Sequence, residues 1–105
     1  MVYTPDKWLI IEVGGQSPHH RVFGSWSGGY LYGDSWRMNS GINGIHREDK
    51  TIVFTGYSGS EYAVHEEMYG ASAYNWSVAK SYEDTNTRVL NEDEAFAWIE
   101  NWVNK

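Results

Sequence analysis

The sequence predicts a single α+β domain over residues 1–105, with a small antiparallel sheet of about five strands. A C-terminal helix at about residues 91–104 and a second helix at about residues 72–83 are expected to cover this sheet. Three observations predict this class. β-Branched and aromatic runs separated by glycine-rich turns fill the first two thirds of the chain. An amphipathic helical pattern closes the chain, and a length of 105 residues suits one domain with its own core.

The helix at about residues 91–104 has the clearest pattern. Asn91 occupies the N-cap position and Glu94 follows three residues later, which is the spacing of a capping box. The first turn is acidic, as the helix dipole favours. At about 100° per residue, one arc collects the apolar side chains of Ala95, Phe96, Trp98, Ile99, Trp102 and Val103. Because so short a helix is marginal alone in water, we expect this arc to pack on the sheet.

Strands are expected at residues 7–13, 20–27, 51–55 and 60–65. Residues 35–47 have a mixed pattern that indicates a strand, a bend at the glycines and a further strand. The run at residues 7–13 is apolar almost without interruption, which is typical of a central strand with both faces covered.

Residues 71–84 fit two structures. A strand would place Tyr74, Trp76, Val78 and Tyr82 on one face. A helix would form an apolar stripe of Ala71, Tyr74, Val78 and Tyr82, with Ser72 as its cap. The alanine content and the length favour a helix at about residues 72–83, and the strand stays open as the alternative.

The charge and the cysteine content exclude several classes of function. The net charge is −6, and no basic cluster is present, so we expect neither nucleic acid nor an anionic membrane surface as a partner. The chain has no cysteine, so it has no disulfide framework and no thiolate metal site. Its short N-terminal apolar run resembles neither a signal peptide nor a membrane span, and we expect a cytoplasmic protein.

No motif of catalysis or metal binding is complete. The four histidines show neither an HExxH motif nor a pair four residues apart. Ser58 lies in a segment that resembles a nucleophile elbow but precedes a strand, and Ser77 with Lys80 matches S-x-x-K without its partner motifs. Asp34 and Glu61 could serve as paired carboxylates of a small hydrolase. We therefore predict no catalytic residue, no metal and no cofactor, and rank a hydrolase last.

Aromatic residues are concentrated around an expected hairpin, whose turn is Gly28-Gly29 and whose return strand begins at Tyr30. One small core buries only part of six tryptophans and eight tyrosines. The candidate binding residues are Trp26, Tyr30, Tyr32 and Trp36. Two interpretations stay open: these side chains fill the core, or some of them form an exposed platform that anchors a protein or stacks on a sugar.

One part of the chain resembles a known group of proteins. The run TGYSGSEY at residues 55–62, His65 and the run MYGASAY at residues 68–74 look like small uncharacterised proteins of marine tailed phages that infect cyanobacteria. The resemblance covers about a quarter of the chain. It implies an intracellular protein made during infection, located in the host cytoplasm, and brings no activity with it.

These observations predict a non-catalytic accessory or regulatory protein that acts by binding another protein, and the resemblance implies that it is phage-encoded. The partner is unidentified, and self-association is compatible with it. The alternative is a small-ligand or carbohydrate-binding module that uses an aromatic sheet face.

Overall fold

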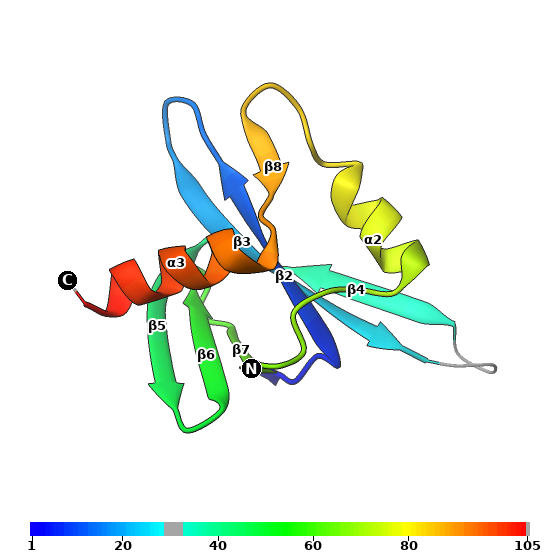
Figure 1. Cartoon of the computed structure of the whole chain (residues 1–105), viewed down its shortest axis with the longest axis horizontal. Helices are drawn as coiled ribbons and strands as arrows, with labels where there is room; N and C mark the ends of the chain where they lie inside the picture. Colours follow the sequence, from blue (N-terminus) through cyan, green and yellow to red (C-terminus); the bar gives the residue numbers. More distant parts are fainter. Residues whose placement is uncertain (29–32, 105) are drawn as a thin grey trace.

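The protein has an α+β fold with eight strands and two helices in the part that the structure describes, residues 1–28 and 33–104 of a computed structural model (Figure 1). Sheet A contains, in spatial order, β1 (Val2–Tyr3), β7 (Glu61–His65), β6 (Thr51–Gly56) and β5 (Ile42–Glu48). Sheet B contains β4 (Asp34–Met38), β3 (His19–Ser27), β2 (Lys7–Val13) and β8 (Thr87–Val89). The helices are α2 (Ala73–Lys80) and α3 (Glu92–Val103). The prediction of one sheet with about five strands is therefore wrong.

The chain changes sheets at a corner between β4 and β5. Asn39 is buried there, and its Oδ1 accepts a hydrogen bond from Val22 N in sheet B at 2.9 Å. Gly41 O accepts from Tyr57 N at 3.1 Å, which joins the corner to sheet A. Gly41 has φ 147°, and a Cβ there would lie 2.9 Å from the Tyr57 ring. The corner sends β5 to β6 instead of back along β4, and this produces a second sheet.

The main core lies between the two sheets. Sheet B contributes Trp8, Ile10 and Val22 to it, and sheet A contributes five residues, Ile42, Ile52, Phe54, Tyr62 and Val64. Trp8 is fully buried, and its Nε1 donates to His65 O at 2.8 Å, so the indole links the sheets by a polar bond as well.

Strand β2 is covered on both faces, as its unbroken apolar run predicts. Trp8 and Ile10 face sheet A, whereas Leu9 and Ile11 belong to a second cluster with Phe23 and with α2. We call this side of sheet B, which faces α2, the outer face. The continuous apolar pattern follows directly from this position between two layers.

Helix α3 confirms the capping box and most of the predicted apolar arc. Asn91 Oδ1 accepts from Glu94 N at 2.8 Å, and Glu94 Oε1 accepts from Asn91 N at 3.0 Å. Ala95 and Ile99 enter the main core, Phe96 and Trp98 pack against its border, and Val103 is exposed. Figure 1 shows α3 crossing β5 and β6 near one end of these strands, between the C-terminus and β8.

Helix α2 exists but is shorter than predicted, with Ser72 as its N-cap and Ser81 as its C-cap. The predicted stripe is confirmed for Ala71 and Val78, which pack against the second cluster, and is wrong for the exposed Tyr74 and Tyr82. The fully buried residues of α2 are Asn75 and Ala79, so small and medium side chains of this helix face the sheet and its aromatic ones turn outward. The strand alternative for this segment is also excluded.

Candidate functional site

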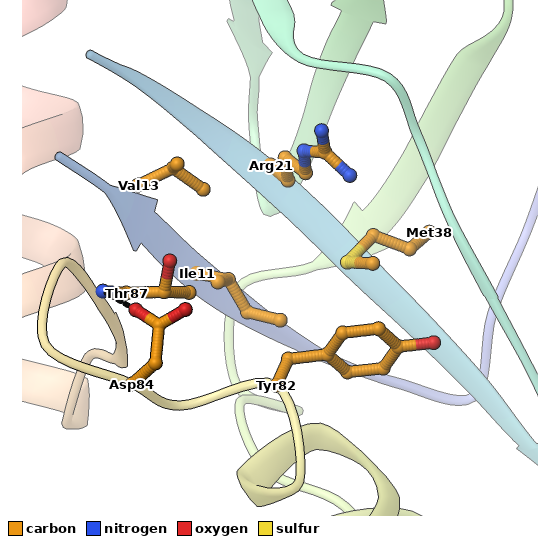
Figure 2. Close-up of a pocket in the computed structure, with 7 residues that line it drawn as sticks. All are labelled: Ile11, Val13, Arg21, Met38, Tyr82, Asp84 and Thr87. Atoms are coloured by element: carbon orange, nitrogen blue, oxygen red, sulfur yellow. Dashed lines mark hydrogen bonds between the residues drawn. The ribbon is translucent and has the colours of Figure 1, made fainter. Parts of the chain in front are cut away.

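A hollow of about 220 Å³ opens on the outer face of sheet B, where α2 no longer covers the strands (Figure 2). We call it the Arg21 pocket. Its lining residues come from β2, β3, the end of β4, the segment that connects α2 to β8, and the start of β8: Ile11, Val13, Arg21, Met38, Tyr82, Asp84 and Thr87. The hollow is below the usual size of about 300–1,000 Å³ for small-molecule sites, so it suits one side chain or a very small ligand.

Strand register assembles the floor of the pocket. Ile11 pairs with Arg21 across β2 and β3, and with Val89 on β8. Met38 pairs with Phe23, which lies two residues beyond Arg21 on β3. Because paired residues of antiparallel strands point to the same face, these side chains share the outer face.

Two aromatic side chains form the rim of the pocket near β4. Trp36 stacks on the buried Phe23 ring with centroids 5.4 Å apart, and Tyr82 approaches Trp36 edge-on at 5.9 Å. Trp36 remains 37% exposed and Tyr82 40% exposed. Their packing fixes them in place, so binding there would cost little side-chain entropy.

The pocket holds one cation whose terminal nitrogens have no described partner. Arg21 Nε donates to His19 Nε2 at 3.1 Å, and His19 Nδ1 lies 2.8 Å from Ser17 O. Since Nε2 accepts, we assign the proton to Nδ1, which donates to the carbonyl. Within residues 1–28 and 33–104, Arg21 forms no ion pair, so its guanidinium is available to a carboxylate.

Asp84 closes the opposite side of the pocket but already has a structural role. Its Oδ1 accepts from Asn86 N at 2.8 Å and from Thr87 N at 2.9 Å. These bonds form the turn that leads into β8. Figure 2 shows Tyr82 and Asp84 on this connecting segment, across the hollow from Arg21.

The cations on β2, β3 and β4 differ from those elsewhere in the described chain. Arg47, Lys50, Lys80 and Arg88 all form ion pairs with glutamates. Lys7, Arg21 and Arg37 lie on β2, β3 and β4, and the structure records no ion pair for them among the described residues. Arg37 instead lies over the Tyr3 ring, 4.6 Å from its centroid. In an acidic protein, these three strands therefore carry cations that pair with no described carboxylate.

The structure separates the aromatic residues that the sequence singled out. Trp36 pairs with Ser25 and faces α2, whereas Trp26 pairs with Ser35 and faces the other way. Trp26 Nε1 donates to Thr4 O at 3.2 Å and thus fastens the linker after β1. Tyr30, Tyr32 and the predicted Gly28-Gly29 turn lie wholly or partly outside the described residues. Trp26 and Trp36 cannot belong to one flat platform, and the binding role of these four residues stays a prediction.

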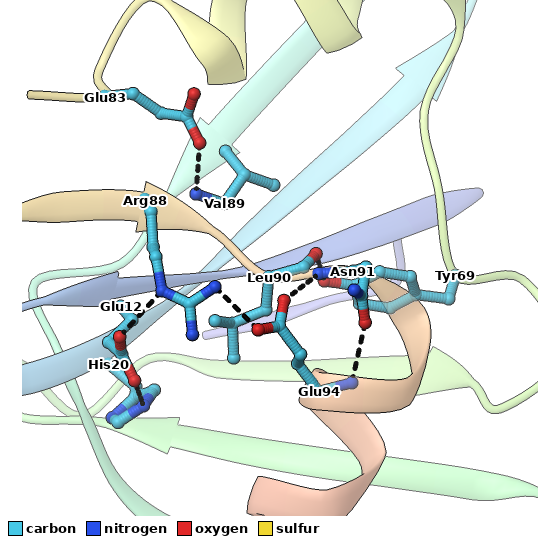
Figure 3. A network of polar contacts seen from close by, with 9 residues as sticks. All are labelled: Glu12, His20, Tyr69, Glu83, Arg88, Val89, Leu90, Asn91 and Glu94. Atoms are coloured by element: carbon cyan, nitrogen blue, oxygen red, sulfur yellow. Dashed lines mark hydrogen bonds and ion pairs between the residues drawn. The ribbon is translucent and has the colours of Figure 1, made fainter.

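A second polar cluster joins β2, β8 and α3 (Figure 3). Arg88 Nε donates to Glu12 at 3.1 Å, and Arg88 Nη1 donates to Glu94 at 2.7 Å. The backbone bond from Asn91 and then the Arg88 guanidinium lower the pKa of Glu94. This cluster holds the end of the sheet to the start of the helix, and its carboxylates are already paired.

His20 lies beside that cluster, stacked on Trp98 with ring centroids 4.1 Å apart. Its Nε2 lies 3.5 Å from Glu12 Oε2, at the outer limit of a hydrogen bond. Burial lowers the pKa of His20, and the neighbouring Glu12 carboxylate only partly opposes this shift. The ring is thus a neutral packing group at neutral pH.

Other arrangements offer less. An open acidic groove of about 560 Å³ is lined by Glu66, Glu67, Glu92, Asp93 and Phe96. Within the described ranges, no three histidine, aspartate or glutamate side chains gather as metal ligands would. None of the helices in the described part of the chain is long and apolar enough to cross a membrane.

Sequence reasoning missed Arg21, Met38, Tyr82 and Asp84. They come from three segments, and only the strand register and the short length of α2 bring them together. The turn signal of residues 84–87 was available as a local clue, but it does not reveal what the turn faces. Comparisons with protein-family models, curated proteins and solved structures found no match for this chain.

Proposed function

We propose that this protein is a non-catalytic accessory or regulatory protein, and that it binds another protein through the Arg21 pocket and its aromatic rim. The observation that carries the proposal is the combination of a hollow sized for one side chain with the exposed, packed pair Trp36 and Tyr82. Protein interfaces concentrate their energy in this way, with an anchor side chain in a pocket beside rigid aromatics. The resemblance to phage proteins is consistent with a bacterial partner in the host cytoplasm.

A random-peptide display library tests the proposal. The enriched peptides should bind the purified protein, and Trp36→Ala or Tyr82→Ala should weaken binding by about tenfold or more. Trp76→Ala and Tyr57→Ala are matched controls, because both side chains are exposed aromatics outside the Arg21 pocket. A library that yields no binder, or binders indifferent to Trp36 and Tyr82, would refute this function.

A small-ligand or carbohydrate-binding module is the second candidate. The feature that favours it is the aromatic surface of Trp36 beside a pocket with both a cation and a hydroxyl, because sugars stack on aromatic rings and bond to polar groups. Titration of glycans with tryptophan fluorescence distinguishes this candidate, since a sugar over Trp36 should shift the emission. Unchanged emission across the glycans would remove it.

A further inference from the structure

We infer that β4 accepts an extended acidic segment of the partner as an additional strand of sheet B, with one apolar side chain of that segment in the Arg21 pocket. The inference rests on the proposed function and specifies the binding mode and the chemistry of the partner. It depends on three features: the direction of the β4 backbone groups, the position of the pocket, and the arginines of β3 and β4.

The hydrogen-bond pattern shows which backbone groups of β4 point outward. Asn39 N donates to Val22 O, and Gly28 N donates to Gly33 O, so these two pairs are hydrogen-bonded pairs. Such pairs alternate with non-bonded ones in an antiparallel ladder. With the observed register, Arg37 and Ser35 turn their backbone groups toward β3. Asp34, Trp36 and Met38 therefore turn theirs toward the open edge.

That edge has no strand beside it within residues 1–28 and 33–104. Sheet B ends at β4, and no hydrogen bond is recorded for the backbone N–H of Trp36 or Met38. Ser35, Trp36 and Arg37 are exposed, although α2 contacts β4 and its N-cap Ser72 donates a hydrogen bond to Asp34 at the start of this strand. An exposed edge of this kind is a template for strand addition.

The pocket lies where the side chains of an added strand would reach. The backbone N–H and C=O groups of Trp36 and Met38 point to the open edge. Their side chains point to the outer face, where Met38 lines the Arg21 pocket. A strand beside β4 would run about 4.8 Å away, with alternate side chains on that face. One of these side chains, next to Met38, would enter the hollow. Backbone hydrogen bonds along the edge and the anchor side chain would then both contribute to binding.

Charge selects an acidic segment rather than a second copy of this chain. Arg37 is on β4 itself, and Arg21 lines the pocket, each without a described carboxylate partner. Carboxylates on both faces of the incoming strand would meet these guanidinium groups. A second copy of a chain with net charge −6 would bring an overall repulsion instead.

The peptides enriched from the display library provide the test. Their sequences should contain one apolar anchor, with aspartate or glutamate at neighbouring positions on both faces of the strand. N-methylation of the peptide backbone at every second position should weaken binding by about tenfold, while the intervening positions tolerate it. On binding, amide exchange at Trp36 and Met38 should slow, and exchange along β5 should not change.

Charge reversal supplies the protein-side test. Arg37→Glu should weaken binding about three- to tenfold at low salt, and the loss should shrink as salt rises. Lys50→Glu makes the same charge change in the β5–β6 turn and should leave binding unchanged.

The outcomes separate the two proposals. Peptides that need Trp36 and Tyr82 but tolerate every N-methylation and Arg37→Glu would keep the proposed function and overturn the added strand. Peptides that bind nowhere near Trp36 would refute both. A dimer of the free protein with protected Trp36 and Met38 amides would show that a second copy occupies the edge, and would overturn the inference.

Discussion

At the scale of single residues, Tyr69 shows how one hydroxyl bridges two backbone groups at the end of a strand pair. Strand β8 ends at Val89, and Leu90 N still donates to Ile10 O at 2.9 Å, but Ile10 N donates to Tyr69 instead of to Leu90 O. Tyr69 Oη accepts from Ile10 N at 3.0 Å and donates to Leu90 O at 2.7 Å. Burial strongly raises the pKa of Tyr69, so the hydroxyl keeps the proton that it donates.

Tyr69→Phe should lower the free energy of unfolding by about 1–3 kcal/mol, because it leaves a buried N–H and a C=O without their partner. Urea denaturation followed by tryptophan fluorescence measures this. Tyr57→Phe is the control, since Tyr57 is exposed and should change stability by less than about 0.5 kcal/mol. Equal effects of the two changes would contradict the bridging role of Tyr69.

Asn75 is the opposite case, a buried polar group that costs stability. Its side chain is 0% exposed, and neither amide atom has a hydrogen-bond partner among the described residues. Asn75→Leu should therefore raise the free energy of unfolding by about 1–3 kcal/mol. Asn101→Leu on the exposed side of α3 corrects for helix propensity. A loss of stability in the Asn75 variant would show that the amide has a partner or that leucine overfills the site.

At the scale of elements, local chemistry accounts for both helix N-termini. The side-chain acceptors Ser72 and Asn91 precede the helices α2 and α3. The burial of α3 was also predictable, because large apolar residues follow a helical period there. The buried side of α2 was not, since its sequence offers apolar residues on several sides and the sheet beneath selects the small ones.

Asn91→Ala should lower the free energy of unfolding by about 1 kcal/mol, because Glu94 N loses its side-chain acceptor, whereas the backbone N–H of residue 91 keeps the Glu94 carboxylate. Thermal unfolding by circular dichroism measures the change. Asn101→Ala, on the same helix but far from its N-terminus, should be neutral or slightly stabilising. If both variants lost the same stability, the cap would not be the cause.

The candidate site could be predicted only in part, for a reason that belongs to this scale. Trp36 was identified because aromatic surplus is visible in composition. Trp26 and Trp36 lie on opposite faces of the sheet because of the register of β3 and β4. The approach of Trp36 to Tyr82 depends on where α2 ends. Arg21 has no local signal at all, because an arginine in a strand is ordinary until its neighbours are known.

At the scale of the whole molecule, the sequence predicts the fold class but not the number of sheets. The patterns of residues 7–13 and 51–55 predict buried strands, but the periodicity of a sequence does not determine which strands pair with each other. That choice is made at the buried Asn39 and at Gly41, whose φ of 147° turns the chain into sheet A. A polar residue in a loop gives no sign in the sequence that it will be buried.

The stability of the molecule should fall in two steps as pH decreases. The pKa of His20 lies below its ordinary 6.5, so the unfolded chain binds a proton more readily, and stability is lost as pH falls below 6.5. The pKa values of Glu83 and Glu94 lie below 4.5, so a second loss should follow as pH falls below 4.5.

Urea denaturation from about pH 7.5 to about pH 4 should resolve the two steps. The variant His20→Gln should lose the first decline and keep the second, because the carboxylates are untouched. Indistinguishable slopes of the variant and the wild type between pH 7.5 and pH 5.5, within about 0.5 kcal/mol, would show that another group controls the first step.

The position of β2 has a consequence for synthesis. This strand leaves the ribosome early, but its neighbours on the β8 side, Tyr69 and Val89, and the α3 residues over its core face are made last. A nascent chain that has reached only Asn86 therefore carries this apolar segment with the stretch Ile11–Val13 of that edge still unpaired. Synthesis of β8 and α3, rather than emergence of the first hairpin, should be the moment at which this strand is protected from aggregation.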